Sequence, residues 1–362
     1  MRRPEPLPTI DEIRQLLEPS GVTHVGVASA EVLLETRKDL HERRAQGLHD
    51  GMQFTYRSPD RSTDPGLAVR DARSVIVAAR PYLTDRDPDR PGAPAGPQAR
   101  VGRYAWVDHY APLRDALRMT AKRIRRSDHR AVAFADDNSI VDRAVAHRAG
   151  LGWYGKNANL LIPGAGSWFV LGSIITTAEY SAATAPASDG CGTCIRCLDG
   201  CPTAAIIAPG VIDAARCLSW ILQKPGSIPL EYRALIHDRI YGCDDCQDLC
   251  PISVRLGPRN TLELDETVGA WVDAVTLLSE NDEWIEQRYG HWYVANRDYR
   301  WVRRNALVVI GNVGDSADQR VLALLDEYRM TSDPILAEHA EWALARLAER
   351  EVAPTDTVTA GS

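Results

Sequence analysis

The sequence predicts an α+β protein with a mixed α/β domain at the N-terminus, a small cysteine-rich domain and an all-α domain at the C-terminus. Three observations favour this fold class. Helical patterns alternate with buried apolar runs up to residue 176, all eight cysteines lie between Cys191 and Cys250, and the pattern beyond Pro251 is helical without strand alternation. The length of 362 residues exceeds the roughly 100–200 residues of one domain, so several domains are expected.

The composition is that of an ordinary globular protein, with 44% hydrophobic and 25% charged residues. Because 49 acidic residues face 42 Lys and Arg, the net charge is −7, and a polyanion would have to meet a local basic patch. The N-terminal residues lack the apolar stretch of a signal peptide, and prolines and glycines interrupt the longest apolar run, residues 160–176. We therefore expect a cytoplasmic protein without a transmembrane helix.

The elements of the N-terminal domain follow from apolar periodicity. Residues 9–47 indicate amphipathic helices around a short strand at His24–Ala28, and Ser74–Ala79 indicates a buried strand. Residues 85–99 are rich in Pro, Gly and Asp and are predicted to form a surface loop. The remaining predictions are helices at Leu113–Arg126 and Asp142–Arg148, strands at Leu160–Ile162 and Trp168–Thr176, and a linker at Ser181–Gly190 with a domain boundary near residue 185.

The cysteines carry the most specific motif of the chain. The string CGTCIRCLDGCP matches the bacterial ferredoxin spacing C-x2-C-x2-C-x3-C-P without a deviation. In that motif three closely spaced thiolates hold one 4Fe–4S cluster, and the fourth cysteine ligates another cluster. A second set is therefore required. CDDCQDLCP supplies its last three positions, and Cys217, separated by 25 intervening residues, supplies the first.

The crossing rule assigns all eight cysteines to two 4Fe–4S clusters. One cluster takes Cys191, Cys194, Cys197 and Cys250, and the other takes Cys201, Cys217, Cys243 and Cys246. A pair of zinc sites is the alternative, but a third cysteine in register followed by Cys-Pro has no role in a zinc ribbon. No C-x-x-C is followed by His, which argues against haem attachment. Two clusters indicate electron transfer to a group held by the remaining residues.

Gly150, Gly152 and Gly155 in GLGWYG satisfy the dinucleotide-binding fingerprint G-x-G-x-x-G, which requires a strand before it and a helix after it. Here a helical pattern precedes the glycines, so Gly150 is better explained as the left-handed residue that ends a helix. We expect the glycines to let the backbone approach a large ligand.

Asp136 is the candidate acid of the N-terminal domain. Phe134 to Asp136 is predicted to be a strand that runs into a turn at Asp137 and Asn138. Adjacent acids at such a place either close a turn and cap a helix, or provide a carboxylic acid whose pKa rises through burial and a neighbouring charge so that it can donate a proton. The residues alone leave both interpretations open.

The C-terminal region is predicted to be helical to about Glu351. Three apolar positions, Ala306, Leu307 and Ile310, align with Ala343, Leu344 and Leu347 at an offset of 37, which indicates paired helices of a short HEAT-like repeat. The expected domains are residues 1–185, 186–258 and 259–352, followed by a disordered tail at 353–362.

Two basic segments are candidates for holding nucleic acid. Arg114, Arg118, Lys122, Arg125 and Arg126 share one helical stripe, which is either a solvated face or a contact surface for phosphates. Residues 288–304, RYGHWYVANRDYRWVRR, combine five arginines with five Tyr and Trp residues. They either stack on unpaired bases or form a helix pair with the aromatic rings in its core.

The order of the motifs along the chain is itself informative. The strings FADDNSIVDRA, AGLGWYGKNANL, GSWFVLGSIIT, CGTCIRCLDGCPTAAI, ARCLSW and RIYGCDDCQDLCP follow one another, and a HEAT-like pattern comes after them. Over about residues 15–350 the chain resembles the epoxyqueuosine reductase family. The resemblance implies a cobalamin-binding N-terminal domain, a ferredoxin-like domain with two clusters and a HEAT-like domain. The implied activity is the reduction of epoxyqueuosine to queuosine at the wobble position of tRNAs with a GUN anticodon.

The resemblance also implies a mechanism and a set of site residues. An external low-potential donor would feed the clusters, the nearer cluster would reduce cob(II)alamin to cob(I)alamin, and this cobalt would act on the epoxide. The family's acid falls on Asp136, whose proton would help the ring oxygen to leave, a role typically worth about 10²- to 10⁴-fold. The implied cobalamin contacts are Arg57, Arg103, Tyr104, Asp136, Lys156, Asn157 and Ser167. A monomer that does not contact membranes is expected.

Some positions depart from the family pattern. Ser139 and Asp142 follow the acid in place of Pro and Glu. The segments that could face the substrate contain Leu222, Gln223 and Lys224, and Ile252 and Ser253. Two other functions therefore stay open: a corrinoid and iron–sulfur reductase of a small molecule, similar to reductive dehalogenases, or a ferredoxin-type electron-transfer protein.

Overall fold

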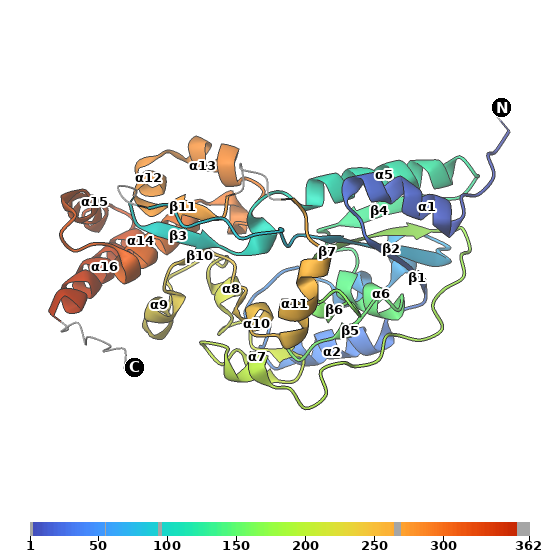
Figure 1. Ribbon diagram of the computed structural model, residues 1–362, viewed down its shortest axis with the longest axis horizontal. Coiled ribbons are helices and arrows are strands. Elements are labelled where there is room, and N and C mark those ends of the chain that lie inside the picture. Colours follow the sequence, from blue (N-terminus) through green and yellow to red (C-terminus); the bar gives the residue numbers. More distant parts are fainter. Residues whose placement is uncertain (1–2, 55, 93–95, 264–268, 353–362) are drawn as a thin grey trace. The chain divides into compact units, whose positions relative to one another are not determined.

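The computed structural model describes residues 3–54, 56–92, 96–263 and 269–352 (Figure 1). The chain divides into two compact units, each assembled from segments that are distant in the sequence. Unit 1 comprises Met1–Asp87, Val107–Cys217 and Asp244–Val268, and unit 2 comprises Pro88–Trp106, Leu218–Cys243 and Gly269–Ser362. The division into three contiguous domains, residues 1–185, 186–258 and 259–352, stays a prediction. The predicted tail at 353–362 lies outside the described residues.

Unit 1 is built on a four-stranded antiparallel sheet in the order β1-β2-β7-β4. The strands are β1 (His24–Ser29), β2 (Ser74–Pro81), β7 (Phe169–Thr176) and β4 (Ala131–Ala135). β2 and β7 are the central strands, and nearly all their residues are buried because both faces of the sheet are covered. Their continuous apolar runs follow from this position, which confirms both strands predicted from the sequence.

Helices cover both faces of this sheet. α1 (Ile10–Leu17) and α5 (Tyr110–Arg125) lie on one face and α6 (Asp142–Arg148) lies on the other (Figure 1). Gly172 in β7 lets α5 approach closely, because a Cβ at this position would lie 2.6 Å from Cδ1 of Leu117. On the α6 face, Val75 and Val77 of β2 pack with Val145 in the core. The predicted helices of this region are thereby confirmed.

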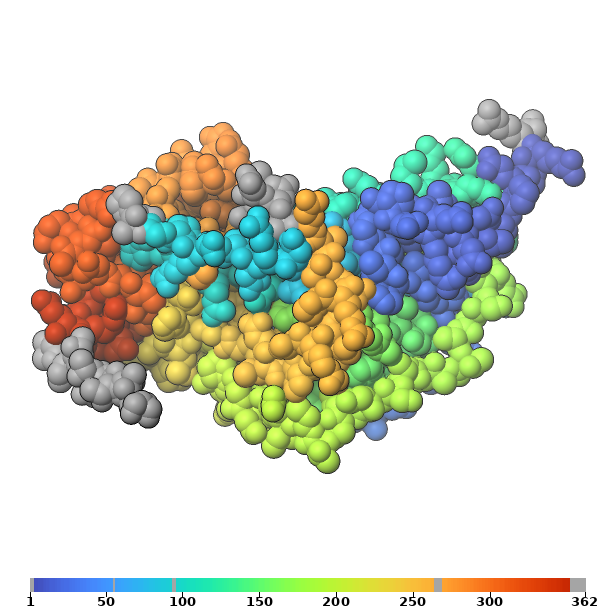
Figure 2. Space-filling view, viewed as in Figure 1, coloured from blue at the N-terminus to red at the C-terminus, as the bar shows by residue number. Residues whose placement is uncertain are grey.

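Unit 1 also contains short elements. They are β5 (Trp153–Tyr154), β6 (Leu160–Leu161), α7 (Arg196–Asp199), β8 (Ile206–Ala208), β9 (Val211–Ile212), α10 (Asp245–Asp248) and α11 (Pro251–Leu256). Two of them, α7 and α10, carry cysteines of the two motifs. The predicted linker at residues 181–190 is mostly exposed and runs along the surface to the first cysteine (Figure 2). Gly150 follows α6 in the left-handed region at φ +70°, as predicted for the residue that ends this helix. The linker passes close to it, because a Cβ added at Gly150 would lie 3.2 Å from Cβ of Ala183.

Unit 2 combines a small sheet with a set of helices. The strand order is β10 (Arg239–Tyr241), β3 (Gln98–Val101) and β11 (Trp271–Asp273). The helices are α8 (Leu218–Ile221), α9 (Leu230–Ile236), α12 (Ala274–Ser279), α13 (Asp282–Tyr289), α14 (Arg300–Val313), α15 (Gln319–Arg329) and α16 (Pro334–Val352).

Two sequence predictions are wrong in unit 2. The surface loop predicted at 85–99 gives way to β3 at its end, where Gln98 and Ala99 are buried. The region beyond Pro251 also contains the strand β11, which pairs with β3. Each of these strands has only three or four residues, too few to show alternation, and both exist because segments distant in sequence pair with them.

The predicted helix pair of unit 2 is confirmed. α14 packs along α16, and Leu307, Ile310 and Ala343 are fully buried. Buried polar side chains on α14 fasten it to neighbouring backbone: Nδ2 of Asn305 donates to the carbonyl oxygens of Leu222 (2.7 Å) and Ile240 (2.9 Å). These bonds satisfy carbonyls that would otherwise be buried without a partner. In the part of the chain that the structure describes, no helix is long and apolar enough to cross a membrane.

Candidate functional site

Four cysteines from two distant segments of unit 1 line one pocket. The pocket has a volume of about 120 Å³ and contains the side chains of Cys191, Cys194, Cys197 and Cys250 in its wall. Burial raises the pKa of the Cys197 thiol, and the charges of Cys250, Cys191 and Cys194 add to the rise against one opposing backbone hydrogen bond. The four thiols are those predicted for the first cluster, and their convergence on a single pocket fits a 4Fe–4S group.

The second predicted set of cysteines is divided by the unit boundary. Cys201, Cys217 and Cys246 belong to unit 1, whereas Cys243 is the last residue of its segment in unit 2. Two of the sulfur atoms accept hydrogen bonds, Cys201 from the backbone N–H of Ala205 (3.3 Å) and Cys246 from Nδ2 of Asn159 (3.9 Å). Such bonds suit thiolate ligands of a cluster, because they stabilise negative charge on sulfur. The assignment of these four cysteines to the second cluster stays a prediction.

A buried polar network ties the cysteine-bearing helices to the sheet of unit 1. The amide of Gln247 on α10 bonds to the hydroxyl of Tyr82 (3.1 Å), and its Oε1 accepts from Oγ of Ser167 (2.8 Å). Ser167 also lies 2.8 Å from Oγ of Ser253 on α11, and Nε1 of Trp168 donates to the carbonyl of Ser253 (3.2 Å). The network orients α10 and α11, and hence Cys246 on α10 and Cys250 directly before α11.

Two of the positions that depart from the family pattern lie in the interior of their units. Ser253 is fully buried within unit 1, and Leu222 is 2% exposed in unit 2. Their burial follows from tertiary contacts. Ser253 forms a hydrogen bond with Ser167, and Leu222 packs beside Ile221 in the apolar core of unit 2. That the segments containing them face the substrate stays a prediction.

Asp136 stands directly after the last residue of β4, in the left-handed region at φ 53°. The turn that follows is closed by Asp137, whose Oδ1 accepts from the backbone N–H of Ser139 (2.7 Å). Of the two interpretations that the sequence left open, the turn role therefore belongs to Asp137, and the exposed Asp136 carboxyl is available for chemistry.

The charge environment of Asp136 suits an acid. Although the residue is exposed, partial desolvation raises the pKa of its carboxyl above the ordinary value. The guanidinium of Arg114 opposes this rise, while Asp108 and Asp137 add to it. A raised pKa keeps a fraction of the carboxyl protonated closer to neutral pH, which a proton donor requires.

A second carboxyl in this region belongs to Asp142, which the sequence marks only as a departure from the family pattern. Asp142 begins α6, and its Oδ1 is buried without a hydrogen-bond partner among the residues that the structure describes. Burial raises the pKa of Asp142 well above the ordinary value, and the charge of Asp136 contributes, with Arg143 opposing and Asp137 adding. In the sequence Asp142 follows Ile140 and Val141 at the first helical position, and nothing in this pattern indicates the burial of its carboxyl.

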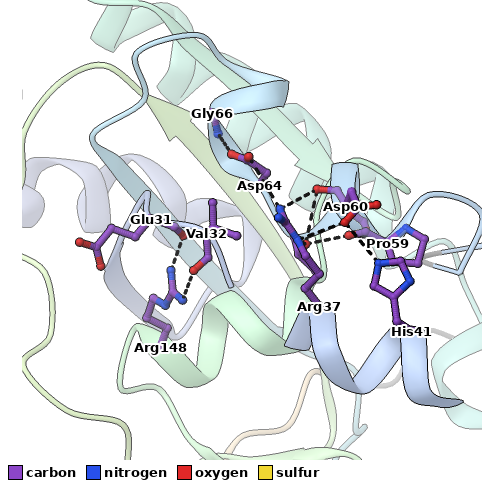
Figure 3. A network of polar contacts seen from close by, with 11 residues as sticks. Glu31, Val32, Arg37, His41, Pro59, Asp60, Asp64, Gly66 and Arg148 are labelled. Atoms are coloured by element: carbon purple, nitrogen blue, oxygen red, sulfur yellow. Dashed lines mark hydrogen bonds and ion pairs between the residues drawn. The ribbon is translucent and has the colours of Figure 1, made fainter. Parts of the chain in front are cut away.

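The loop that carries Arg57 is anchored at its flanking helices, α2 (Leu34–Ala45) and α3 (Pro59–Ser62). Arg37 on α2 donates to the carbonyl of Asp60 (3.0 Å), and the ring of His41 lies 3.2 Å from the Asp60 carboxylate (Figure 3). Arg37 also bonds to Oγ1 of Thr63 (2.9 Å). The exposed Arg57 thus lies on a loop with fixed ends, and it stays a predicted cobalamin contact.

The other predicted cobalamin contacts are spread over both units. Lys156 lines the cysteine pocket, Asn157 donates to the carbonyl of Cys246 (3.1 Å), and the hydroxyl of Ser167 belongs to the buried network. Arg103 and Tyr104 lie in unit 2. These residues stay predictions as cobalamin contacts, although the hydrogen bonds found for Asn157 and Ser167 are internal.

Gly152 and Gly155 occupy positions that leave no room for a side chain, and Gly155 also lines the pocket of the four cysteines. A Cβ at Gly152 would lie 2.2 Å from the carbonyl oxygen of Leu161, and one at Gly155 would lie 2.2 Å from Cδ1 of the same leucine. The glycines therefore permit close packing around β5 and β6, and the predicted approach of the backbone to a large ligand stays a prediction.

The two basic segments differ in character. On α5 the side chains of Arg118 and Lys122 are exposed along one side, Arg126 directly after the helix is exposed as well, and the stripe begins at Arg114, whose charge acts on Asp136. In the segment 288–304, the structure buries Trp292, Tyr299, Trp301 and Arg304 within unit 2. Trp292 stacks between Tyr241 and Tyr289, at ring distances of 4.5 and 4.4 Å. The structure thus favours a core role for these aromatic residues.

Comparisons with known proteins extend over most of the chain. The family described as 4Fe-4S double cluster binding domain matches residues 190–253. Epoxyqueuosine reductase of Xanthomonas campestris pv. campestris is 34% identical over 360 residues, which cover 96% of this chain and 98% of that protein.

Solved structures agree with this match. Epoxyqueuosine reductase from Streptococcus thermophilus has a TM-score of 0.84 at 28% identity, covering 96% of this chain and 95% of that one. An epoxyqueuosine reductase in complex with an epoxyqueuosine-modified tyrosine tRNA stem loop has a TM-score of 0.84 at 27% identity, covering 93% and 90%. Because the matches extend far beyond the cysteine motifs, a ferredoxin-type electron-transfer protein is not supported. The chain belongs to the epoxyqueuosine reductase family, which confirms the predicted oxidoreductase with two 4Fe–4S clusters and cobalamin as cofactors.

Proposed function

We propose that this chain reduces epoxyqueuosine to queuosine in tRNA and that Asp136 is the proton donor. The position of Asp136 carries the proposal: an exposed carboxyl with a raised pKa at the end of β4, next to a turn that Asp137 already closes. The reaction takes up two electrons and two protons, and it releases the epoxide oxygen as water. An alkoxide is a poor leaving group until it is protonated, so a positioned acid is required.

The chain's own residues divide the work of this reaction. When bound, the clusters supply single electrons and cobalamin supplies a strongly reducing metal centre. Cys191, Cys194, Cys197 and Cys250 would hold the first cluster, and Cys201, Cys217, Cys243 and Cys246 the second. Arg57, on its anchored loop, is the proposed contact to the rim of cobalamin.

The α5 stripe is our proposed contact surface for the tRNA backbone. Its exposed cations form one side of a helix, and Arg114 at its start acts electrostatically on Asp136. A phosphate-binding stripe that leads to the acid suits a substrate carried on a nucleic acid. The structure of the relative with a modified tRNA stem loop supports tRNA as the substrate.

Three finer points complete the proposal. We place the protein in the cytoplasm, since eight cysteines committed to clusters need a reducing compartment. An external low-potential donor must supply the electrons, because no residue in the chain is a net source of them. We propose that the working form is a monomer.

The direct test compares Asp136→Asn with Asp137→Asn in the cofactor-loaded enzyme. Single turnover of tRNA bearing epoxyqueuosine is followed by mass spectrometry of the nucleosides. Asp136→Asn should lower the rate about 10²- to 10⁴-fold, because the amide cannot donate a proton of comparable acidity. Asp137→Asn keeps the side-chain oxygen that closes the turn and should remain within a few-fold of the unmodified enzyme.

Equal rates in the two variants would remove Asp136 as the donor. Normal cofactor loading without queuosine from the unmodified enzyme would instead point to a small-molecule substrate.

A further inference from the structure

The loop from Gly155 to Asn159 contacts both cysteine motifs of unit 1. Nζ of Lys156 donates to the carbonyl oxygen of Gly192 (2.7 Å), which lies in the sequence between Cys191 and Cys194. The same lysine lines the pocket formed by the four cysteines of the first cluster. A positive charge is therefore held at the wall of the pocket by a hydrogen bond to the cluster-binding loop itself.

The other end of the loop reaches the second motif. Asn159 donates from Nδ2 to Sγ of Cys246 (3.9 Å), a predicted ligand of the second cluster. Asn157 holds the contact in place, since its Nδ2 donates to the backbone carbonyl of Cys246 (3.1 Å) and its Oδ1 accepts from the backbone N–H of Asn159 (3.2 Å). The sulfur thus receives a hydrogen bond whose donor is itself oriented.

We propose that Lys156 and Asn159 set the reduction potentials of the two clusters, Lys156 that of the first and Asn159 that of the second. Reduction adds one electron to a cluster that already carries negative thiolates. A nearby cation or an N–H donor to a ligand sulfur stabilises the reduced state more than the oxidised state and raises the potential. The inference rests on the proposed two-cluster function, and it makes these two side chains positioning residues for electron transfer.

The geometry of the loop depends on two backbone features. Ala158 adopts φ +60°, and a Cβ at Gly155 would lie 2.7 Å from Oδ1 of Asn157. Glycine at 155 therefore leaves room for the Asn157 side chain that orients Asn159. The loop thereby presents Lys156 and Asn159 toward different cysteine motifs although only two residues separate them in the sequence.

The test measures the midpoint potential of each cluster in the full-length, reconstituted protein by redox titration with electron paramagnetic resonance detection. Lys156→Gln removes the charge and should shift one potential to more negative values, and Lys156→Arg should restore it. Asn159→Leu removes the donor at similar volume and should lower the other potential. Lys38→Gln, at an exposed position of α2, is the matched control and should change neither.

Iron content separates tuning from cluster loss. Unchanged potentials in Lys156→Gln or Asn159→Leu, with both clusters present, would overturn the role of that residue. Loss of a cluster in Lys156→Gln that Lys156→Arg also shows would make the lysine a structural part of the loop and would equally overturn tuning. The potentials are measured without tRNA, so shifted potentials in a protein that makes no queuosine would leave this inference standing while the proposed function fails.

Discussion

Two carboxyls of unit 1, Asp136 and Asp142, differ in what surrounds them. Asp136 is exposed, and its pKa is raised mainly by partial desolvation, with Arg114 and Asp108 acting in opposite directions. Asp142 has a buried oxygen without a partner among the described residues, and its pKa is raised much further. The first environment suits proton donation to a substrate, and the second makes stability depend on pH.

Removing the negative charge of Asp108 or the positive charge of Arg114 should shift the pH dependence of the reaction rate in opposite directions. Asp108→Asn removes a negative charge and keeps the oxygen that accepts from the backbone N–H groups of Tyr110 (3.0 Å) and Ala111 (2.9 Å), so the helix start is preserved. The pKa of Asp136 should fall, and the decline of the rate at high pH should begin at lower pH. Arg114→Gln should move that decline to higher pH.

Single-turnover rates measured against pH check this pair. Because the donor must be protonated, the rate falls as the pH rises through the pKa of Asp136. Superimposable profiles in the unmodified enzyme and both variants would contradict the assignment.

Asp142→Asn should stabilise the protein in a pH-dependent way. The folded pKa is raised, so the native state holds a proton that the unfolded state has released above about pH 3.9. The stability that the protonated Asp142 contributes to the unmodified protein is therefore lost progressively as the pH rises from that value through the folded pKa. Asn cannot ionise, and the stability difference in favour of the variant should grow with pH and then level off.

Urea unfolding at a series of pH values measures this difference. A difference that stays constant across the series would show that Asp142 does not carry a raised pKa in the folded protein.

Elements differed in how far the sequence could predict them. The central strands β2 and β7 and the helices α5, α6 and α14 have periodic or continuous apolar patterns, and these were predicted. β3 and β11 were not, because their burial depends on pairing with each other. The cysteines could be identified because their spacing is a local pattern. The contacts of Asn159 and Gln247 could not be predicted, because they are made to residues 80 or more positions away.

The α5 helix predicts a salt-dependent interaction with tRNA. Arg118→Gln and Lys122→Gln each remove an exposed cation from the stripe. Each should weaken binding and reduce the slope of log affinity against log salt by about one, as expected for the loss of one phosphate contact. Binding titrations at several salt concentrations give the slope, and Lys38→Gln on α2 serves as control.

Slopes unchanged in both variants would move the tRNA site away from α5.

At the scale of the whole molecule, we expect unit 1 to hold the first cluster and the proton donor. The first cluster pocket, the loop that contacts both motifs and Asp136 all belong to it. Unit 2 contributes the HEAT-like helix pair and the predicted residues Cys243, Arg103 and Tyr104. The fold class and the cofactors could be predicted because both follow from the order of the motifs, which is visible in the sequence. Contacts between residues far apart in the sequence are not visible there.

An omission experiment under anaerobic conditions tests whether the protein needs cobalamin to make queuosine. The reconstituted protein, a strong reductant and tRNA bearing epoxyqueuosine are combined with and without cobalamin, and the nucleosides are read by mass spectrometry. We expect queuosine when cobalamin is present and none when it is left out. Queuosine formed equally without cobalamin, or none formed by a protein that holds both clusters and cobalamin, would contradict this expectation.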